Sequence, residues 1–334
     1  MPDWLLYTGS RRPHDGVDRL PPPPPWRSFG GGPPLPVPEG GSGADHHATA
    51  YRPSDDAVQQ VNAALYLRRP LLVTGPPGTG KSTLAYAVAH ELKLGPVLHW
   101  PITSRATLRD GLYQYDPLTR LYAAGRPGGG HADRTGDAAA DDDIGRYIRL
   151  GPLGTALLPY GRPRVLLIDE IDKSDIDLPN DLLTIFEKGE YEIPELSRRD
   201  EPEARVLTAD GGGPGARVAV TGGRVACAAF PLVVMTSNGE REFPPAFLRR
   251  CVTVDLRQPA DAAELAAIVR EHLGPLADRS DDLVRRFLER SSGGTLATDQ
   301  LLNAVYLCRH ADVSDRRELA DRIMPYLSGA ADDD

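Results

Sequence analysis

The chain has 334 residues, of which 40% are apolar and 25% charged, so it is long enough for one large domain or two modest ones. Its 38 Lys and Arg residues are outnumbered by 47 Asp and Glu residues, and the net charge of −9 argues against a generally basic nucleic-acid binder. No apolar run approaches the roughly 20 residues that span a bilayer, and the first residues lack the apolar stretch of a signal peptide. The three cysteines, Cys227, Cys251 and Cys308, are too far apart to suggest a zinc site or a disulfide framework. These features predict a cytoplasmic protein without a membrane segment.

Residues 1–50 contain 11 prolines, including the run Pro21–Pro25, together with clusters of glycine. Proline lacks a backbone N–H and glycine loses much backbone entropy on folding, so this stretch is expected to be a disordered leader. An alternative is a docking arm for a partner that binds polyproline.

Short apolar runs alternate with helical patterns over residues 51–258, which is typical of βαβ units. Ser54 is the expected N-cap of the first helix, and further helices are expected over Ser82–Leu92 and Leu178–Lys188. The glycine-rich stretches 125–143 and 208–223 are expected to be loops. The runs expected to form buried parallel strands are Leu71–Thr74, Val97–Ile102, Val165–Ile168, Leu232–Thr236 and Val252–Leu256.

The strand signal stops after residue 260. Residues 259–328 therefore predict an all-helical part, and the acidic tail 329–334 is expected to be solvated. The expected helices are Asp261–Leu273, Asp281–Ser291, Asp299–Arg309 and Arg316–Leu327.

The segment Gly75–Ser82 (GPPGTGKS) matches the phosphate-binding P-loop motif, directly after an expected strand and at the start of an expected helix. Its glycines let backbone N–H groups turn inward, where the helix N-terminus adds positive charge. The expected role of Lys81 is to contact the β and γ phosphates, and that of Ser82 is to bind Mg²⁺. The alternative, a glycine turn with an exposed lysine, is disfavoured by this context. The predicted nucleotide-binding residues are Gly75, Pro76, Pro77, Gly78, Thr79, Gly80, Lys81, Ser82 and Thr83.

Two carboxylates end the apolar run Val165–Ile168. Asp169 is expected to hold Mg²⁺ through water, and Glu170 to act as the general base that activates the attacking water. An Asp-Glu pair after a strand is usually a solvated strand end. A position downstream of a P-loop, on a strand of its own, favours the functional interpretation.

Two further polar positions follow the same strand order. Asn238 comes directly after Leu232–Thr236, where an amide can position the attacking water, although Asn is also common in turns. Arg249 and Arg250 precede the last expected strand. Paired arginines are ordinarily surface residues, but an arginine supplied by a neighbouring subunit can also stabilise transition-state charge.

Aromatic and imidazole side chains near the second expected strand have two interpretations. Trp100 and His99 are expected to be interior residues. Tyr113 and Tyr115 are more typical of a packing face, and the alternative is a substrate-gripping pore loop.

Together these motifs resemble those of the AAA+ ATPases, and within them the MoxR-like branch, over about residues 51–328. The resemblance implies an α/β P-loop NTPase fold with a five-stranded parallel sheet in the order 5-1-4-3-2 and a C-terminal all-helical lid. It also implies an insertion around the second helix, matched by residues 103–158, and a β-hairpin before sensor 1, matched by about residues 206–227. The motifs that carry it are GPPGTGKS (Gly75–Ser82), VLLIDEID (Val165–Asp172), LPNDLLTIFEKGEYEIPE (Leu178–Glu195), TSN (Thr236–Asn238) and FPPAFLRRC (Phe243–Cys251).

The resemblance further implies ATP and Mg²⁺ as cofactors and a ring, usually a hexamer, with nucleotide between subunits. Arg250 matches the family's arginine finger, with Arg249 as second choice, and Asn238 matches sensor 1. The family's sensor 2 arginine should fall near residues 296–300, but the sequence there is Leu-Ala-Thr-Asp-Gln. Neither Thr298 nor Asp299 offers a cationic clamp, which raises the question of how the lid responds to ATP.

The resemblance favours a ring ATPase that remodels or activates a protein client, often together with a partner that bears a von Willebrand factor A domain. A slowly hydrolysing, nucleotide-gated scaffold or switch is the first alternative, because sensor 2 is missing. A nucleic-acid motor of the restriction type is less favoured by the acidic balance. A small-molecule kinase would not need the TSN motif or the arginine pair.

Overall fold

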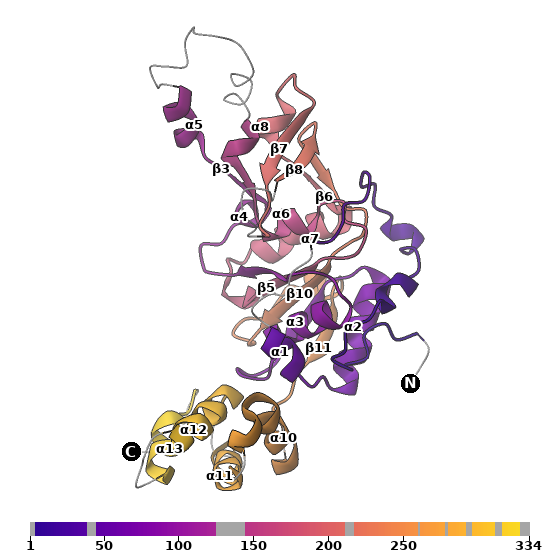
Figure 1. The fold of residues 1–334 in the computed structure, drawn as a ribbon. Coiled ribbons are helices and arrows are strands. Elements are labelled where there is room, and N and C mark those ends of the chain that lie inside the picture. Colours follow the sequence, from indigo (N-terminus) through magenta and orange to yellow (C-terminus); the bar gives the residue numbers. More distant parts are fainter. Residues whose placement is uncertain are drawn as a thin grey trace.

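The computed structural model describes residues 4–38, 45–124, 144–210, 217–259, 261–277, 280–291, 296–310 and 316–327. The expected loop at 125–143 and the expected acidic tail at 329–334 lie outside these ranges. Figure 1 shows three parts stacked along the molecule, with a helical part at the bottom, a central sheet with its helices in the middle, and a second sheet at the top. Within the described ranges, no helix is both long enough and apolar enough to cross a membrane.

The central sheet is parallel, and its strand order confirms the predicted 5-1-4-3-2 arrangement. Each apolar run predicted as a strand forms one, with ends shifted by no more than a residue or so. In spatial order the strands are β11 (Val252–Asp255), β1 (Leu71–Thr74), β10 (Leu232–Ser237), β5 (Val165–Asp169) and β2 (Leu98–Pro101).

Alternate side chains of these strands enter two apolar cores on opposite faces of the sheet. Leu71 and Val73 belong to one core, whereas Leu72 belongs to the other. The first face is covered by α2 (Asp55–Leu67) and α3 (Lys81–Glu91), and α1 (Asp45–Ala50) packs on α3. The second face is covered by α4 (Leu108–Leu112), α6 (Pro152–Ala156) and α7 (Leu178–Lys188). The Ser54 hydroxyl accepts a hydrogen bond from the backbone N–H of Ala57 at 3.2 Å, so the predicted N-cap of α2 is confirmed.

A second sheet stands above the central one (Figure 1), and of its strands the resemblance implied only a β-hairpin at about 206–227. Its strands have three to five residues and mix buried with exposed positions, so they lack the apolar runs that reveal the central strands. Gly222 and Gly223 both have positive φ and link two strands in a tight hairpin, so the β-hairpin implied by the resemblance is present where the glycine content alone predicted a loop. In order the strands are β3 (Tyr113–Tyr115), β4 (Ile148–Leu150), β7 (Glu203–Leu207), β8 (Arg217–Thr221), β9 (Arg224–Ala226) and β6 (Glu190–Glu192), accompanied by α5 (Pro117–Ala124) and α8 (Pro194–Ser197).

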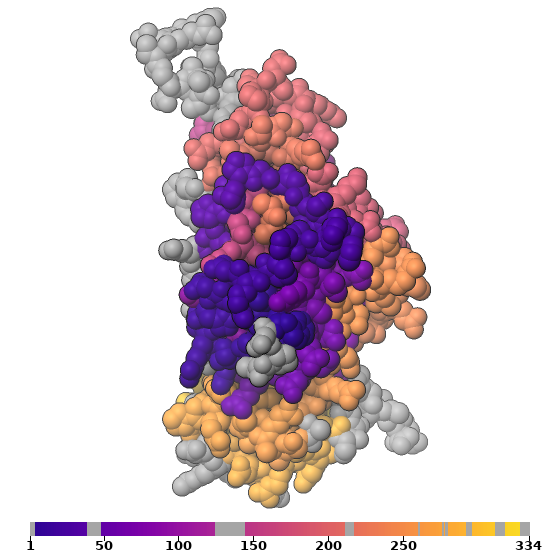
Figure 2. Space-filling model, turned by 90° about the vertical axis from the view of Figure 1, so that its right-hand side faces the viewer, coloured from indigo at the N-terminus to yellow at the C-terminus, as the bar shows by residue number. Residues whose placement is uncertain are grey.

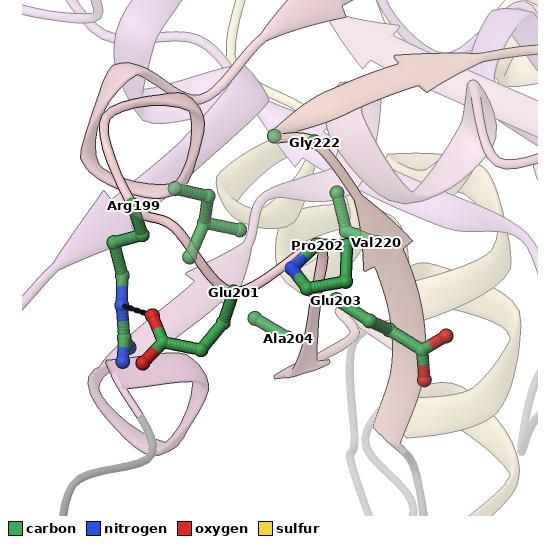
Figure 3. Close-up of a pocket in the computed structure, with 9 residues that line it drawn as sticks. Arg199, Glu201, Pro202, Glu203, Ala204, Val220 and Gly222 are labelled. Atoms are coloured by element: carbon green, nitrogen blue, oxygen red, sulfur yellow. Dashed lines mark hydrogen bonds and ion pairs between the residues drawn. The ribbon is translucent and has the colours of Figure 1, made fainter.

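The second sheet also holds a small hollow beside β7 and β8 (Figure 3). Arg199 and Glu201 form an ion pair of 2.8 Å at its rim. Its volume of about 10 Å³ leaves room for about one water molecule. The hollow is therefore too small for an organic ligand.

The expectation of a disordered leader is wrong for residues 4–38, named the strap here. Figure 2 shows the strap in indigo, lying over one face of the molecule between the helical part below and the second sheet above. Leu5, Leu6, Tyr7 and Val17 of the strap are buried in the core under α2 and α3. The high proline and glycine content of this stretch predicted disorder, but the few apolar residues between them pack into the core one by one.

Two buried polar side chains fix the first part of the strap. Asn62 of α2 accepts hydrogen bonds from the N–H groups of Leu6 and Tyr7 at 2.7 and 3.1 Å, and donates to the carbonyl of Tyr7 at 2.7 Å. Glu91, the last residue of α3, accepts from the N–H groups of Thr8 and Arg11 at 2.7 and 2.9 Å. A backbone without regular secondary structure is thereby satisfied by side chains.

The C-terminal part, named the lid here, contains helices at the positions that the sequence predicts. The last of them ends at Ile323 rather than Leu327. Its apolar residues form a separate core that includes Leu265, Phe287 and Leu301. Within the described ranges the helices are α10 (Ala262–Leu273), α11 (Asp281–Ser291), α12 (Thr298–His310) and α13 (Arg316–Ile323).

The packed strap predicts a stability effect for Asn62→Ala. The substitution leaves three buried backbone groups of the strap, the N–H groups of Leu6 and Tyr7 and the carbonyl of Tyr7, without their partner, so we expect the free energy of unfolding to fall by about 2–4 kcal/mol. Urea unfolding measures this change. Gln59→Ala, on the exposed side of the same helix, is the control and should change stability by less than about 0.5 kcal/mol. Equal effects of the two variants would contradict a docked strap.

Candidate functional site

The loop between β1 and α3 has the backbone that its glycines were predicted to allow. Gly75, Gly78 and Gly80 have φ values of +141°, +76° and +83°, a region that side-chain-bearing residues rarely adopt. A Cβ at Gly75 would lie 2.2 Å from the carbonyl oxygen of Leu256, and one at Gly80 would lie 2.8 Å from the ring of Tyr51. Both conformation and close packing therefore require glycine in this loop.

Lys81 is the first residue of α3, and its side chain folds back over the loop. Its ammonium donates hydrogen bonds to the carbonyls of Gly75 and Pro76, both at 2.8 Å. Burial lowers the pKa of Lys81, and the nearby carboxylates of Asp172, Asp169 and Glu170 offset only part of that shift. The amine is thus held inside the loop by hydrogen bonds that an anionic oxygen can replace.

Asp169, the last residue of β5, is the centre of a hydrogen-bonded cluster. Its Oδ1 accepts from the hydroxyls of Ser82 and Thr236, both at 2.6 Å, and its Oδ2 lies 3.4 Å from Nε2 of His99. Burial alone would raise the pKa of Asp169, but hydrogen bonds from His99, Ser82 and Thr236 outweigh that effect and lower the pKa to about 2. The carboxylate is therefore ionised at neutral pH.

The donor set around Asp169 suits Mg²⁺. Ser82 and Asp169 present hard oxygen ligands that already touch each other. Magnesium needs few protein ligands because it keeps several waters. Across the part of the chain that the structure describes, no group of three or more His, Cys, Asp or Glu side chains could form another metal centre.

Glu170 lies next to this cluster but outside it. Its backbone is left-handed, with φ of +60°, and its N–H donates to the Thr236 hydroxyl at 2.8 Å. Its carboxylate is half-exposed and accepts from the ammonium of Lys173 at 2.8 Å. The carboxylate is accessible to water, and a neighbouring cation holds it.

Asn238 follows β10, which pairs with β5, so its backbone lies at the same sheet edge as Asp169 and Glu170. Its N–H donates to Oδ2 of Asp172 at 2.9 Å, and the N–H of Glu240 donates to the same atom at 3.2 Å. Asp172 is buried, and its other carboxylate oxygen has no hydrogen-bond partner. Asp172 therefore orders the turn that carries Asn238.

Arg249 and Arg250 lie at the amino ends of the strands, opposite the ends that carry Asp169 and Glu170. They follow α9 (Pro245–Leu248) and precede β11, whose first residue pairs with Leu71 at the start of β1. The P-loop follows the other end of β1, about 13 Å further along the strand. Arg250 hydrogen-bonds Glu187 of α7 and the carbonyl of Ala246, whereas the side chain of Arg249 is exposed. The structure does not bring these arginines together with the P-loop of the same chain.

The start of α12, where a sensor 2 arginine was sought, packs on the P-loop through its backbone. A Cβ at Gly78 would lie 2.6 Å from the backbone nitrogen of Thr298 and 2.7 Å from the Cβ of Ala297. Gln300 turns inward and bonds the N–H of Ala297 and the carbonyl of Pro325. The lid thus meets the loop by close apposition, with no cation at residues 296–300.

One expectation about the neighbouring residues is corrected. His99 is not interior: β2 is an edge strand with alternating burial, and the side chain is 41% exposed beside Asp169. Tyr113 is buried in β3 and donates to Glu195 at 2.7 Å, which agrees with the expected packing face rather than with the alternative of a pore loop. Trp100 is buried as expected.

Sequence reasoning missed Thr236 as a site residue. It noted the TSN motif but assigned a role only to Asn238. The available signal was a hydroxyl near the end of the buried strand β10, directly beside the strand that carries the carboxylates.

The family model for the AAA domain (dynein-related subfamily) matches residues 70–251, which is more than half of the chain and includes the P-loop, Asp169, Glu170 and Arg250. A search of curated proteins gave no significant match. The matched segment, the strand order of the central sheet and the glycine loop agree, and the chain therefore belongs to the AAA family of P-loop ATPase domains.

Proposed function

We propose that this protein is a MoxR-like AAA+ ATPase that binds and hydrolyses ATP at subunit interfaces of a ring, taken to be a hexamer, and so remodels or activates a protein client. One observation carries the proposal. The P-loop lies at the carboxyl ends of the parallel strands, whereas the Arg249–Arg250 pair lies at their amino ends. An arginine of one subunit can serve a nucleotide only on its neighbour, and head-to-tail contacts of that kind close into rings.

Within one subunit the proposed roles follow the contacts. Lys81 exchanges its bonds to loop carbonyls for phosphate oxygens, and Gly78–Thr83, after the two prolines of the loop, supply backbone N–H groups around them. Ser82 and Asp169 would hold Mg²⁺, which neutralises charge on the phosphates when bound. Glu170 accepts a proton from the attacking water, and Asn238 orients that water. Thr236 fixes the carboxylate of Asp169 and the backbone of Glu170 at once.

The proposed partner is a protein, with a von Willebrand factor A domain protein as first candidate. Both rest on the MoxR-like resemblance of the motifs between Gly75 and Cys251. Nucleic acid is disfavoured by the net charge of −9.

A slow nucleotide-gated switch is the second candidate, and one contact favours it. Lys173 pairs with Glu170 at 2.8 Å, so the carboxylate must leave this cation before it can face an attacking water. Barely measurable turnover with tightly retained ATP would support the switch, and a rate of at least about 1 s⁻¹ would support the remodelling ATPase.

The two substitutions Lys81→Ala and Glu170→Gln test the site directly. Lys81→Ala removes a charged hydrogen-bond donor and should weaken ATP binding about 10- to 100-fold. Glu170→Gln should keep binding and lower the hydrolysis rate about 10²- to 10⁴-fold, because it removes only the base. Binding is measured by calorimetry and hydrolysis by phosphate release. Unchanged affinity in Lys81→Ala would refute the site, and the ATP-trapped Glu170→Gln protein is the bait for co-purifying the client.

Complementation tests the arginine in trans. Arg250→Ala and Glu170→Gln should each be inactive alone, since fingers contribute about 10³- to 10⁵-fold to the rate. Mixed one to one, they should recover up to about a quarter of the wild-type ATPase rate, because some interfaces then join an intact base to an intact arginine. Arg249→Ala is the matched control. An Arg249→Ala protein that is inactive alone and recovers when mixed with Glu170→Gln would move the finger to Arg249, and no recovery with either inactive arginine variant would contradict shared sites.

Thr236→Val tests the hydroxyl that hydrogen-bonds both the Asp169 carboxylate and the Glu170 backbone. It preserves shape but removes one of the hydroxyls bonded to Asp169, so kcat/KM should fall about 10- to 100-fold. The pKa of Asp169 should rise, which moves the acid limb of the pH–rate profile upward. Thr236→Ser should retain activity, and Thr253→Val on the exposed side of β11 should have no effect. A wild-type profile for Thr236→Val would contradict the assigned role.

A further inference from the structure

The lid touches the rest of the molecule at few polar points. The Gln258 side chain bonds the carbonyl of Leu296, and the start of α12 lies on Gly78. Glu271 of α10 makes two ion pairs that join the lid to the remainder of the chain. Glu271 therefore ties α10 to the strap and to the segment before α2.

Two arginines converge on one oxygen of Glu271. Arg11 of the strap donates to its Oε1 at 2.8 Å, and Arg52 donates to the same atom at 2.7 Å. The Arg11 guanidinium also donates to the carbonyl of Thr49 at 3.2 Å. Hydrogen bonds from Arg52 and Arg11 lower the pKa of Glu271, so it is ionised at neutral pH. Arg11, Arg52 and Glu271 are named the lid clamp here.

Arg11 is fixed independently of the lid. Its backbone N–H donates to the buried carboxylate of Glu91 at 2.9 Å, and its φ of +62° is an unfavourable conformation that the surrounding contacts maintain. Glu91 ends α3, and Lys81 of the P-loop begins it. One rigid helix thus links the phosphate loop to the anchor of Arg11.

The second arginine is tied to the P-loop from the other side. Arg52 follows Tyr51, whose ring packs so closely on Gly80 that a Cβ there would lie 2.8 Å away. The same carboxylate therefore holds α10 of the lid against a segment that covers Gly80, while α12 covers Gly78. Both glycines belong to the phosphate loop.

We propose that Arg11 and Arg52, acting through Glu271, are positioning residues that hold the lid over the P-loop and so set the rate at which nucleotide leaves. The clamp acts in place of a direct cation from residues 296–300, where the structure has close backbone contact instead. This inference rests on the proposed nucleotide site, but the clamp itself exists without nucleotide and can be measured separately.

The test uses the full chain and mant-ADP with Mg²⁺. Arg11→Ala keeps the backbone bond to Glu91 and removes one partly exposed pair, so the dissociation rate should rise about two- to fivefold. Glu271→Ala removes both pairs and should raise it about five- to twentyfold, with little further effect of Arg11→Ala in that background. Arg11→Lys should restore part of the loss, and the differences should shrink at 1 M salt.

Arg12→Ala is the matched control, because Arg12 is the exposed neighbour of Arg11 and its side chain has no hydrogen bond to the described residues. Hydrogen exchange of α10 in the nucleotide-free protein is the second readout, and it should accelerate in Arg11→Ala but not in Arg12→Ala. Equal release and equal exchange in Arg11→Ala, Glu271→Ala and Arg12→Ala would overturn the clamp. Failure of the wild type to bind mant-ADP would instead overturn the nucleotide site, and exchange would still decide on the clamp.

Discussion

One carboxylate oxygen organises the site of this protein. Oδ1 of Asp169 accepts hydrogen bonds from both Ser82 and Thr236, so a single atom joins the helix after the P-loop to two adjacent strands. A half-buried carboxylate is costly without such donors. Because the Thr236 hydroxyl also accepts a hydrogen bond from the N–H of Glu170, the oxygens proposed to bind metal and the proposed base are linked through one side chain. These side chains are therefore held in place by the central sheet, in which β5 and β10 are buried on both faces.

The parallel topology also separates the two groups of residues that the proposed reaction needs. All carboxyl ends of the strands meet at one edge, which collects the P-loop, Asp169, Glu170 and Asn238. The arginines lie before a strand and so fall at the other edge, where Arg250 rests against Glu187. A subunit built in this way is incomplete by itself under the proposed mechanism. Two groups that must meet during the reaction are kept apart within each chain.

The central sheet and the P-loop were predictable because buried parallel strands appear as uninterrupted apolar runs, and Val165–Asp169 is a clear example. Most of the second sheet was not, since strands such as Ile148–Leu150 are short, carry arginine between apolar residues and pair with a segment distant in sequence, Tyr113–Tyr115. The prolines of the strap suggested disorder, whereas its order depends on Asn62 and Glu91 elsewhere in the chain. The interior position expected for His99 was wrong although the predicted order 5-1-4-3-2 puts its strand at the edge of the sheet, where alternate side chains can be exposed.

The strap also constrains the order in which the molecule can be completed. Its partners Asn62 and Glu91 emerge from the ribosome within the first hundred residues, so the N-terminal segment can dock early in synthesis. Arg11 must wait for Glu271, 260 residues later in the chain. Contacts of such long range form late, because a large loop must close before they can stabilise anything. β1 also waits for its sheet partners β10 and β11, at residues 232–255, so the phosphate loop and the lid helices are completed close together in synthesis.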